Sequence, residues 1–554
     1  MKLFNRKELR GKSGKLRILS LFAVISFFVS FWTFADTVDS NNKFDQGLVQ
    51  LVKSGFSNTE KAVDLINNSG DGRAIDVLKL LLNGDLYQRK VDHVLVTVRG
   101  KDGRDYIVAP LFSTDIELQQ TISKRKIKKI VINNNIRRTI KSSLAGLSLS
   151  SPKEDVRLKA ITQLMGSMDE DTYLLLSEKL KSEKDSDVID LGNTALAIFD
   201  LKNSNDTKVQ ESAIGILGTS YQPDARNALT LFINTHSGSS LVSDAKKSLG
   251  LIEQRESIAD WIQTLFFGLS LGSVLVLAAI GLAITFGVMG VINMAHGELI
   301  MLGAYTTYVV QTLMPNHIGL SIFVSIPLAF IVSGLVGIAI ERGVMRFLYG
   351  RPLETLLATF GISLVLQQAV RTIFSPLNRS VSTPEWMQGV ISLNPMLSLT
   401  LNRLYIIVFC LIVFAILFMI LKYTRLGIEV RAVSQNRSMA RAMGVKSEWV
   451  DAMTFGLGSG IAGISGVALS QLTNVGPNLG QSYIIDSFMV VVFGGVGNLW
   501  GTLVAGMSLG IANKVMEPWA GAVLAKILVL VFIILFIQKK PRGLFPQKGR
   551  SAEG

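Results

Sequence analysis

The stretch KYTRLGIEVRAVSQNRSMARAMGVKSEWVD, residues 422–451, separates two long apolar runs and fixes the orientation predicted for the rest of the chain. It carries six Lys or Arg side chains against three acidic ones. An excess of Lys and Arg in a short loop between membrane helices marks the cytoplasmic side of a membrane. We therefore expect the chain to cross a membrane on both sides of this segment, which we name the basic loop.

The composition indicates a chain that is only partly embedded in a membrane. Of its 554 residues 49% are hydrophobic, and the apolar weight falls mostly after Ile258. We expect a soluble part before this residue and a membrane part after it. The formal net charge of +14 could indicate a nucleic-acid partner, but the basic residues gather at the N-terminus, at 124–129, between the apolar runs and in the tail. That distribution favours membrane orientation over nucleic-acid binding.

Cysteine and histidine usage gives no reason to expect a metal or a disulfide. Cys410 is the only cysteine, so no internal disulfide can form. The four histidines are scattered and lack the spacing of metal ligands.

Residues 1–35 have the pattern of a secretory signal peptide, with a basic start, an apolar run over 18–34 and a small residue at Ala35. The alternative is an uncleaved anchor helix, because the apolar run is borderline in length for a span. Either would deliver the following residues, 36–257, to the outside.

Residues 36–257 are predicted to form a mostly helical domain with a small β-hairpin, 93–98 and 105–109. Between about residues 152 and 255 an apolar pattern at helical spacing recurs with an offset of 53 residues. A repeat of this kind predicts two stacked helix pairs resembling HEAT repeats, and it suggests a role in binding other chains. The recurring positions include Val156, Ala160 and Ile161, which return as Val209, Ala213 and Ile214.

The membrane part, residues 258–545, is predicted to be all-α with eight or nine spans, followed by a tail at 546–554. Counting five crossings back from the basic loop puts residue 258 outside, where the signal sequence also sends the soluble part. The basic tail belongs inside, so the stretch 483–513 is split at 494–498 to keep the number of crossings even. The expected spans are 261–289, 298–314, 319–340, 353–374, 403–421, 452–471, 484–497, 499–513 and 521–537.

Polar groups inside the apolar half are candidate functional residues. A glycine-punctuated turn at 287–298 contains three of them, and two more lie at membrane depth further along the chain. Such groups are costly on a lipid face, so they indicate either a translocation pathway or a structural tie between helices. The five residues are Asn293, His296, Glu298, Thr359 and Gln367.

Glycines at 456–466 include a formal GxGxxG, but a dinucleotide fingerprint must follow a strand and open a soluble helix. This one falls inside a predicted span. Gly456, Gly460 and Gly466 are therefore assigned to close packing between membrane helices.

Several ordered motifs carry a resemblance over residues 258–545. They are GLSLGS at 268–273, GLAITFGVMGVINMAHGE at 281–298, GAY at 303–305, TRLG at 424–427, FGGVG at 493–497 and PRGLF at 541–545. Together they resemble the LivH-type permeases of branched-chain amino acid ABC importers. The resemblance implies a multi-pass protein of the bacterial inner membrane that is not an enzyme.

The resemblance also implies partners. These would be a second, LivM-type permease, two cytoplasmic ATPase subunits, a periplasmic solute-binding protein and the membrane lipid. No complete phosphate-binding loop occurs in the sequence, so ATP would be used by the partners and no cofactor is expected on this chain. The basic loop would dock a short helix, about 438–445, on the ATPase. Its expected coupling residues are Arg425, Gly427, Arg431, Ala440, Arg441 and Gly444.

Residues 1–257 depart from the LivH-type subunits for amino acids, which lack such a domain. Urea-importer permeases of the same family carry one, preceded by a signal, so the chain most resembles these. The membrane motifs alone leave branched-chain amino acids or short amides open as cargo. A membrane-tethered periplasmic interaction or sensor protein is a further alternative, although a tether does not require the basic loop.

Overall fold

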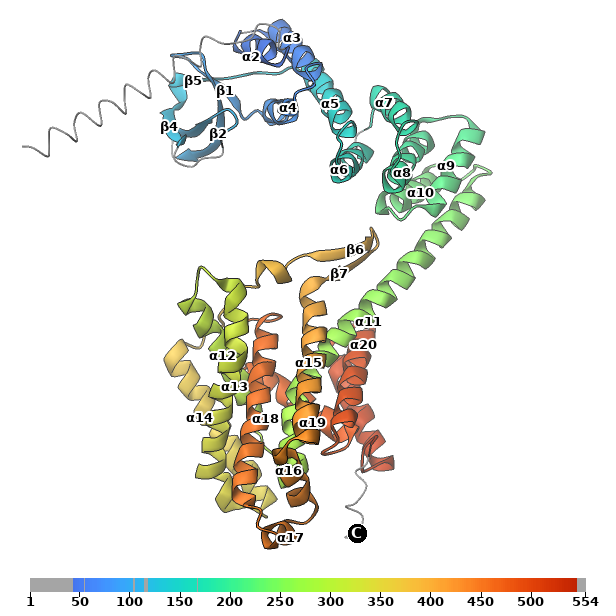
Figure 1. The fold of residues 1–554 in the computed structure, drawn as a ribbon. Coiled ribbons are helices and arrows are strands. Elements are labelled where there is room, and N and C mark those ends of the chain that lie inside the picture. The colour runs from blue at the N-terminus through green and yellow to red at the C-terminus, as the bar shows by residue number, and fades with distance from the viewer. Residues whose placement is uncertain (1–42, 54, 103–104, 114–117, 167, 546–554) are drawn as a thin grey trace, which may run out of the picture. The chain divides into compact units, whose positions relative to one another are not determined.

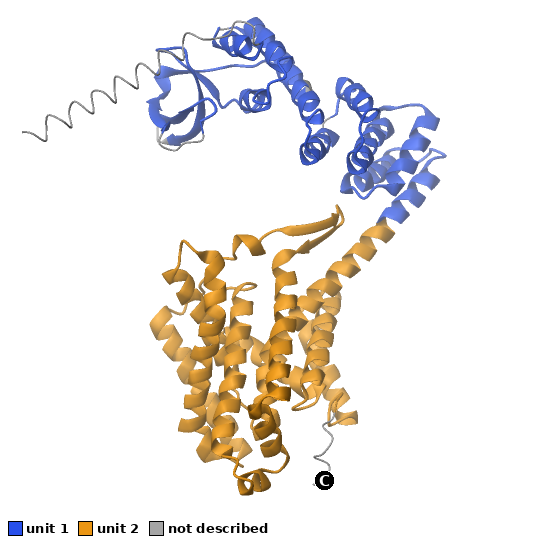
Figure 2. Cartoon of the chain, viewed as in Figure 1, with its two compact units in different colours: residues 1–252 blue, residues 253–554 orange. Residues whose placement is uncertain are grey.

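A computed structural model describes residues 43–545, apart from 54, 103–104, 114–117 and 167. The expected signal segment, 1–35, and the tail, 546–554, lie outside the described residues. The chain divides into two compact units, residues 1–252 and 253–554 (Figure 2). Helix α11 (Val242–Met289) begins in the first unit and ends in the second.

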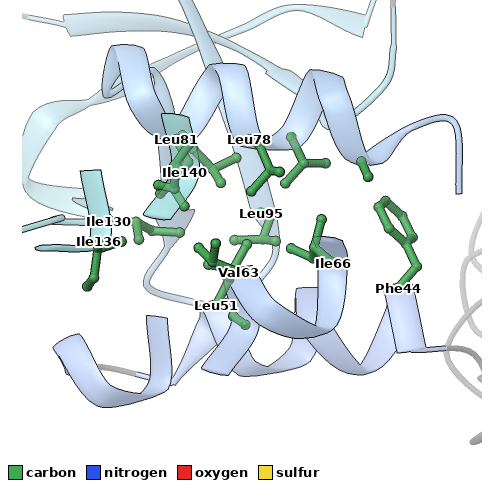
Figure 3. Close-up of a cluster of buried hydrophobic side chains, with 14 residues drawn as sticks. Phe44, Leu51, Val63, Ile66, Leu78, Leu81, Leu95, Ile130, Ile136 and Ile140 are labelled. Atoms are coloured by element: carbon green, nitrogen blue, oxygen red, sulfur yellow. The ribbon is translucent and has the colours of Figure 1, made fainter. Parts of the chain in front are cut away.

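The first unit opens with a small helical core (Figure 3). Phe44, Val63 and Leu78 are fully buried in it, on three successive helices, and Ile136 and Ile140 close it from a fourth. Apolar residues spaced three or four apart place these side chains on one face of each helix. The helices are α2 (Lys43–Val52), α3 (Phe56–Asn67), α4 (Ala74–Asn83) and α5 (Asn134–Leu149).

An antiparallel sheet lies between α4 and α5 in the sequence, with the strand order β4-β3-β2-β1-β5. Its strands are β1 (Leu86–Arg89), β2 (Leu95–Asp102), β3 (Asp105–Pro110), β4 (Gln120–Ser123) and β5 (Ile127–Lys129), and the 3₁₀ turn η2 (Lys124–Lys126) joins the last two. The predicted hairpin is confirmed as β2 and β3, where Val98 pairs with Val108. The other three strands are too short to show an alternating pattern in the sequence.

The sheet must curl strongly. Strands β4 and β5 are its two edges, yet only four Cα steps separate Ser123 from Ile127. Four steps reach at most about 14 Å, whereas the edges of a flat five-stranded sheet lie roughly 19 Å apart. The sheet therefore closes on itself far enough to bring β4 and β5 near each other.

The 53-residue period appears in the remaining helices of the first unit, but each repeat contains three helices and not two. Helices α6 (Glu154–Met165) and α9 (Thr207–Thr219) begin 53 residues apart, as do α7 (Glu170–Leu180) and α10 (Pro223–Thr235). The third member of the first repeat is α8 (Ser186–Asn203), and α11 takes its place in the second. The expected number of two helices in each repeat was wrong, because 53 residues hold three helices of this length.

An equivalent hydrogen bond occurs within each of the two repeats. Arg157 Nη1 donates to the carbonyl of Ser151, and Gln210 Nε2 donates to the carbonyl of Ser204, both at 2.8 Å. Donors and acceptors are each 53 residues apart. The same loop-to-helix hydrogen bond is thus made twice by different side chains.

The second unit is a helical bundle (Figure 1). All nine predicted spans coincide with helices, the last two as the limbs of α20, which bends at Gly521 (φ 75°) just after Pro518. Among the described residues six helices are long and apolar enough to cross a membrane: α11, α13, α14, α15, α18 and α20. The bundle helices after α11 are α12 (His296–Leu313), α13 (Ile318–Gly343), α14 (Pro352–Phe374), α15 (Leu401–Tyr423), α16 (Arg425–Gln435), α17 (Arg437–Ala442), α18 (Ser447–Ser470), α19 (Leu479–Gly494) and α20 (Leu499–Lys539).

Shorter elements join these helices. A hairpin, β6 (Val390–Asn394) and β7 (Leu397–Thr400), connects α14 to α15 and was not predicted. The 3₁₀ turns are η3 (Met345–Leu348) and η4 (Glu385–Met387).

Candidate functional site

The polar turn between α11 and α12 is held by its own side chains. Gly290 takes a positive φ of 69°, which ends α11, and Asn293 Oδ1 accepts a 3.0 Å hydrogen bond from the Ala295 amide. An asparagine that bonds the backbone two residues on is a common way to fix a turn. The structure thus gives Asn293 a structural role in the turn.

His296, the first residue of α12, is fully buried. Its Nε2 lies 2.9 Å from the carbonyl of Ala278 on α11. A carbonyl oxygen can only accept, so the proton is assigned to Nε2. His296 therefore joins the start of α12 to α11.

Glu298 is the third residue of α12, in its first turn, and is 1% exposed. Its Oε1 accepts hydrogen bonds from Gln367 Nε2 at 2.7 Å and from Ser363 Oγ at 3.0 Å, both on α14. Its Oε2 is buried and has no hydrogen-bond partner among the described residues. This carboxyl group is therefore bonded on one side and offers an acceptor on the other.

One face of α14 carries a polar stripe that meets this carboxyl group. Its members lie four residues apart, so they line up along the helix. Thr359 Oγ1 accepts a 3.2 Å hydrogen bond from the amide of Met294 in the polar turn. All members are buried: Thr355, Thr359, Ser363 and Gln367.

Of the five polar residues predicted from the sequence, the structure brings Glu298, Thr359 and Gln367 to one interface between α14 and the start of α12. Asn293 and His296 make their hydrogen bonds outside this interface, to Ala295 and to Ala278. Ser363 and Thr355 were missed, although their four-residue spacing from Thr359 was a usable signal. We name Glu298, Thr359, Ser363 and Gln367 the polar site.

The polar site has the chemistry of hydrogen bonding. It offers amide, hydroxyl and carboxyl groups inside an apolar bundle, which an uncharged polar solute can exchange for its bonds to water. No group of three or more His, Cys, Asp or Glu side chains that could hold a metal ion occurs among the described residues.

The basic loop folds into two short helices. Thr424 caps α16 by accepting from the Gly427 amide, and a Cβ added to Gly427 would lie 2.0 Å from the carbonyl oxygen of Leu421. Arg431 Nη1 donates to that same Leu421 carbonyl at 2.6 Å. Helix α16 is therefore fastened to the end of α15. On its outer side, Arg425 pairs with Glu429 at 3.0 Å.

Helix α17 is the short helix expected at 438–445, but it covers Arg437–Ala442. It ends early because Gly444 adopts a φ of +88°, and the Val445 amide then closes the helix by donating to the Ala440 carbonyl at 3.0 Å. Such a left-handed glycine is a usual helix terminator. Ala440 faces the bundle and is buried, whereas Met439 and Met443 are exposed.

Two arginines hold α17 to the start of α18. Arg437 donates to both carboxylate oxygens of Asp451, at 2.5 and 2.6 Å, and lies 3.8 Å from the centre of the Tyr349 ring. Arg441 Nε donates to Ser447 Oγ at 2.6 Å. Arg437 was not among the predicted coupling residues, although it makes the strongest of these contacts. These bonds leave Met439 on α17 and Met443, directly after it, exposed.

The glycines of α18 lie where other helices approach most closely. A Cβ on Gly456 would lie 2.7 Å from Ile338, and one on Gly460 would lie 2.5 Å from Phe330, both on α13. A Cβ on Gly466 would lie 2.1 Å from the carbonyl oxygen of Ile300 on α12. A larger residue at Gly456 or Gly460 would displace these side chains, and one at Gly466 would push α12 and α18 apart because it meets backbone.

The two closing motifs of the sequence bind each other. The amides of Leu544 and Phe545 donate to the carbonyls of Phe493 and Gly494, at 2.9 and 3.1 Å. Gly543 makes this possible with a φ of +74°, in contact with the backbone of Gly495. The segment after α20 is thus fastened to the break between α19 and α20.

Comparison with known proteins identifies the membrane unit. Residues 264–537 match the family model of the branched-chain amino acid transport system permease component. This segment belongs to that permease family. The chain is therefore a multi-pass membrane permease component, and its relatives are transport subunits. Residues 1–252 lie outside the part matched by the family model.

Individual permeases are similar to the chain. The LivH protein of Salmonella typhimurium, a high-affinity branched-chain amino acid permease, is 29% identical over 300 residues, which cover 52% of this chain and 96% of LivH. The BraD permease of Pseudomonas aeruginosa is 29% identical over 296 residues, with the same coverage. The ribose import permease RbsC of Escherichia coli is 25% identical over 231 residues, or 38% of this chain and 61% of RbsC. No solved structure gives a significant match.

Proposed function

We propose that the chain is the permease subunit of an ABC importer that moves urea inward across the bacterial inner membrane. The observation that carries the choice of cargo is the free acceptor of the polar site, Glu298 Oε2, which is buried beside Ser363 and Gln367. Urea has no charge and presents N–H donors in two directions. A carboxylate-bearing solute would bring a negative charge toward a buried acidic side chain, which is unfavourable in a low-dielectric bundle.

The first unit supports the same cargo. LivH is covered over 96% of its length by 300 residues, so it has no room for a counterpart of a second domain of this size. The resemblance to urea-importer permeases rests on that additional domain. In this proposal residues 36–257 lie in the periplasm, where their repeats bind another chain.

The proposed importer contains further subunits. A second, LivM-type permease would complete the membrane part, two cytoplasmic ATPase subunits would bind the basic loop, and a periplasmic solute-binding protein would deliver the solute. The ATPases would hydrolyse ATP, and this chain would bind no cofactor. The exposed outer face of α17 supports this arrangement because it offers Met439 and Met443 to a partner. Methionine-rich surfaces suit contacts that must adapt as a partner changes shape.

A second cargo, a branched-chain amino acid or a short amide, is favoured by the names of LivH and BraD. The less favoured reading as a tethered periplasmic sensor predicts that deletion of residues 36–255 abolishes function while the basic loop can be altered freely.

The test is uptake of labelled urea by cells whose only importer contains this subunit. We expect unlabelled urea to compete and unlabelled leucine to have no effect. Uptake of labelled leucine that urea does not inhibit would replace urea by an amino acid as the cargo. No uptake of either solute by cells that contain the chain in their membrane would contradict both.

A further inference from the structure

Three helix ends and one helix face in the membrane unit line a cleft of about 620 Å³. They are the end of α11, the end of α15, the start of α20 and the inner face of α16. The floor is apolar and includes Ile284 and Val288. A volume of this size lies in the range of small-molecule sites, roughly 300–1,000 Å³.

One wall of the cleft is aromatic. The rings of Phe418 and Trp500 meet edge to face with their centres 5.8 Å apart, and Phe414 packs against Trp500 at 5.2 Å. Trp500 is nevertheless 52% exposed, so the wall has a free side. An apolar chain lying along this wall would remove it from water or from bulk lipid.

The mouth of the cleft is positively charged. Lys422 and Arg431 line it, and none of the described residues that line it is acidic. The Lys422 ammonium lies 5.3 Å from the Phe418 ring centre, which holds it at the rim. Arg431 uses one donor on the Leu421 carbonyl, and a guanidinium has five.

Helix dipoles lower this charge without reversing it. The ends of α11, α15 and α16 each contribute about half a negative charge, and the starts of α16 and α20 each contribute about half a positive one. The sum is about half a negative charge, against the two full positive charges of Lys422 and Arg431. The mouth therefore stays positive.

The cleft lies at the level of a membrane surface. Lys422 occupies the last turn of α15, and the exposed Tyr423 and Trp500 are of the type that gathers where hydrocarbon meets headgroups. In the orientation of the proposed function this is the cytoplasmic surface, so that placement, although not the cleft itself, rests on the proposed function.

We propose that this cleft binds one anionic phospholipid. The phosphodiester lies between Lys422 and Arg431, and an acyl chain follows the wall of Phe418 and Trp500. Basic pockets between spans at the cytoplasmic side are suited to such headgroups. A free phosphate would use the mouth and leave the aromatic wall uncovered. Because Arg431 also bonds the end of α15, the lipid bridges the membrane and the basic loop.

The test uses the full chain in nanodiscs of phosphatidylcholine with and without phosphatidylglycerol, followed by native mass spectrometry of the lipid that stays bound. We expect one phosphatidylglycerol to be retained and phosphatidylcholine to be lost. Lys422→Gln and Arg431→Gln should each lower retention about fivefold. The matched controls Lys446→Gln and Arg425→Gln remove the same charges from exposed positions of the basic loop that do not line the cleft, and they should change nothing.

A third variant separates a lipid from a soluble anion. Trp500→Ala should lower phosphatidylglycerol retention while inorganic phosphate fails to displace the lipid from the wild type. Equal retention of both lipids, displacement by inorganic phosphate, or release of the lipid when a second permease subunit binds would overturn the proposal. None of these outcomes measures uptake, so a cargo other than urea would leave the result unchanged.

Discussion

Gln367 Nε2 donates a 2.7 Å hydrogen bond to Glu298 Oε1, and this bond joins the middle of α14 to the first turn of α12. Its neighbour in the sequence, Gln368, is exposed on the other side of α14. Helix α14 thus presents the Gln367 amide to the polar site and the Gln368 amide to the surroundings of the bundle. The two glutamines therefore provide a matched comparison for the role of the polar site.

Gln367→Leu should impair both folding stability and uptake. It removes one of the two donors to Glu298 Oε1 and leaves Ser363 as the other. The loss of one such hydrogen bond costs about 0.5–1.5 kcal/mol. We expect a lower midpoint of thermal unfolding in detergent and lower solute uptake in cells. Gln368→Leu serves as the control and should leave both unchanged. If the two variants behave alike, the polar site has no special part in transport.

Gly466→Ala should destabilise the bundle. The added methyl group would lie 2.1 Å from the carbonyl oxygen of Ile300, so α12 and α18 would have to separate. Overpacking of this kind typically costs about 1–3 kcal/mol. Gly361→Ala is the control, because no atom lies within 4 Å of its Cβ position, and it should stabilise α14 slightly. The readout is the unfolding midpoint of each purified variant. An unchanged midpoint for Gly466→Ala would show that the helices separate without cost.

The sequence and the structure agree where long periodic patterns exist. The apolar runs of the sequence coincide with helices of the second unit, and the 53-residue offset matches the distance between the starts of α6 and α9. Contacts between distant segments were beyond sequence reasoning: nothing in the pattern pairs Arg437 with Asp451, or β5 with β1, because these depend on how the chain folds back. Ser363 is an intermediate case, since its spacing from Thr359 was visible but a lone serine carries little signal in an apolar run.

Gly444→Ala should uncouple the basic loop without preventing membrane insertion. An alanine at a φ of +88° is strained by about 1–2 kcal/mol, so α17 would lose the turn that ends it. The control is Gly350→Ala, which introduces similar strain at a φ of +81° outside the basic loop. We expect uptake to fall several-fold only for Gly444→Ala, at equal amounts of protein in the membrane. Equal loss in both variants would attribute the effect to general strain.

The first unit should lose stability in acid through Glu183. Burial alone would raise the pKa of this carboxyl group, but the amides of Lys184 and Asp185 and the Arg157 guanidinium, 2.9 Å away, outweigh it and hold the pKa below its usual value. A depressed folded-state pKa adds stability above the unfolded-state pKa of about 4.3, and this stability is lost as the pH falls through the folded-state value. Hydrogen exchange of the amides of α6 and α8 in the full chain, corrected for intrinsic rates, should therefore show opening free energies that decline below about pH 4.3.

Glu183→Gln should lower these free energies at neutral pH by about 1–3 kcal/mol and flatten their decline, since the neutral amide has no proton to gain. Glu178→Gln, at an exposed position of α7, should keep the wild-type profile. A decline of the same steepness in Glu183→Gln would mean that another carboxyl group controls the acid stability of the repeats.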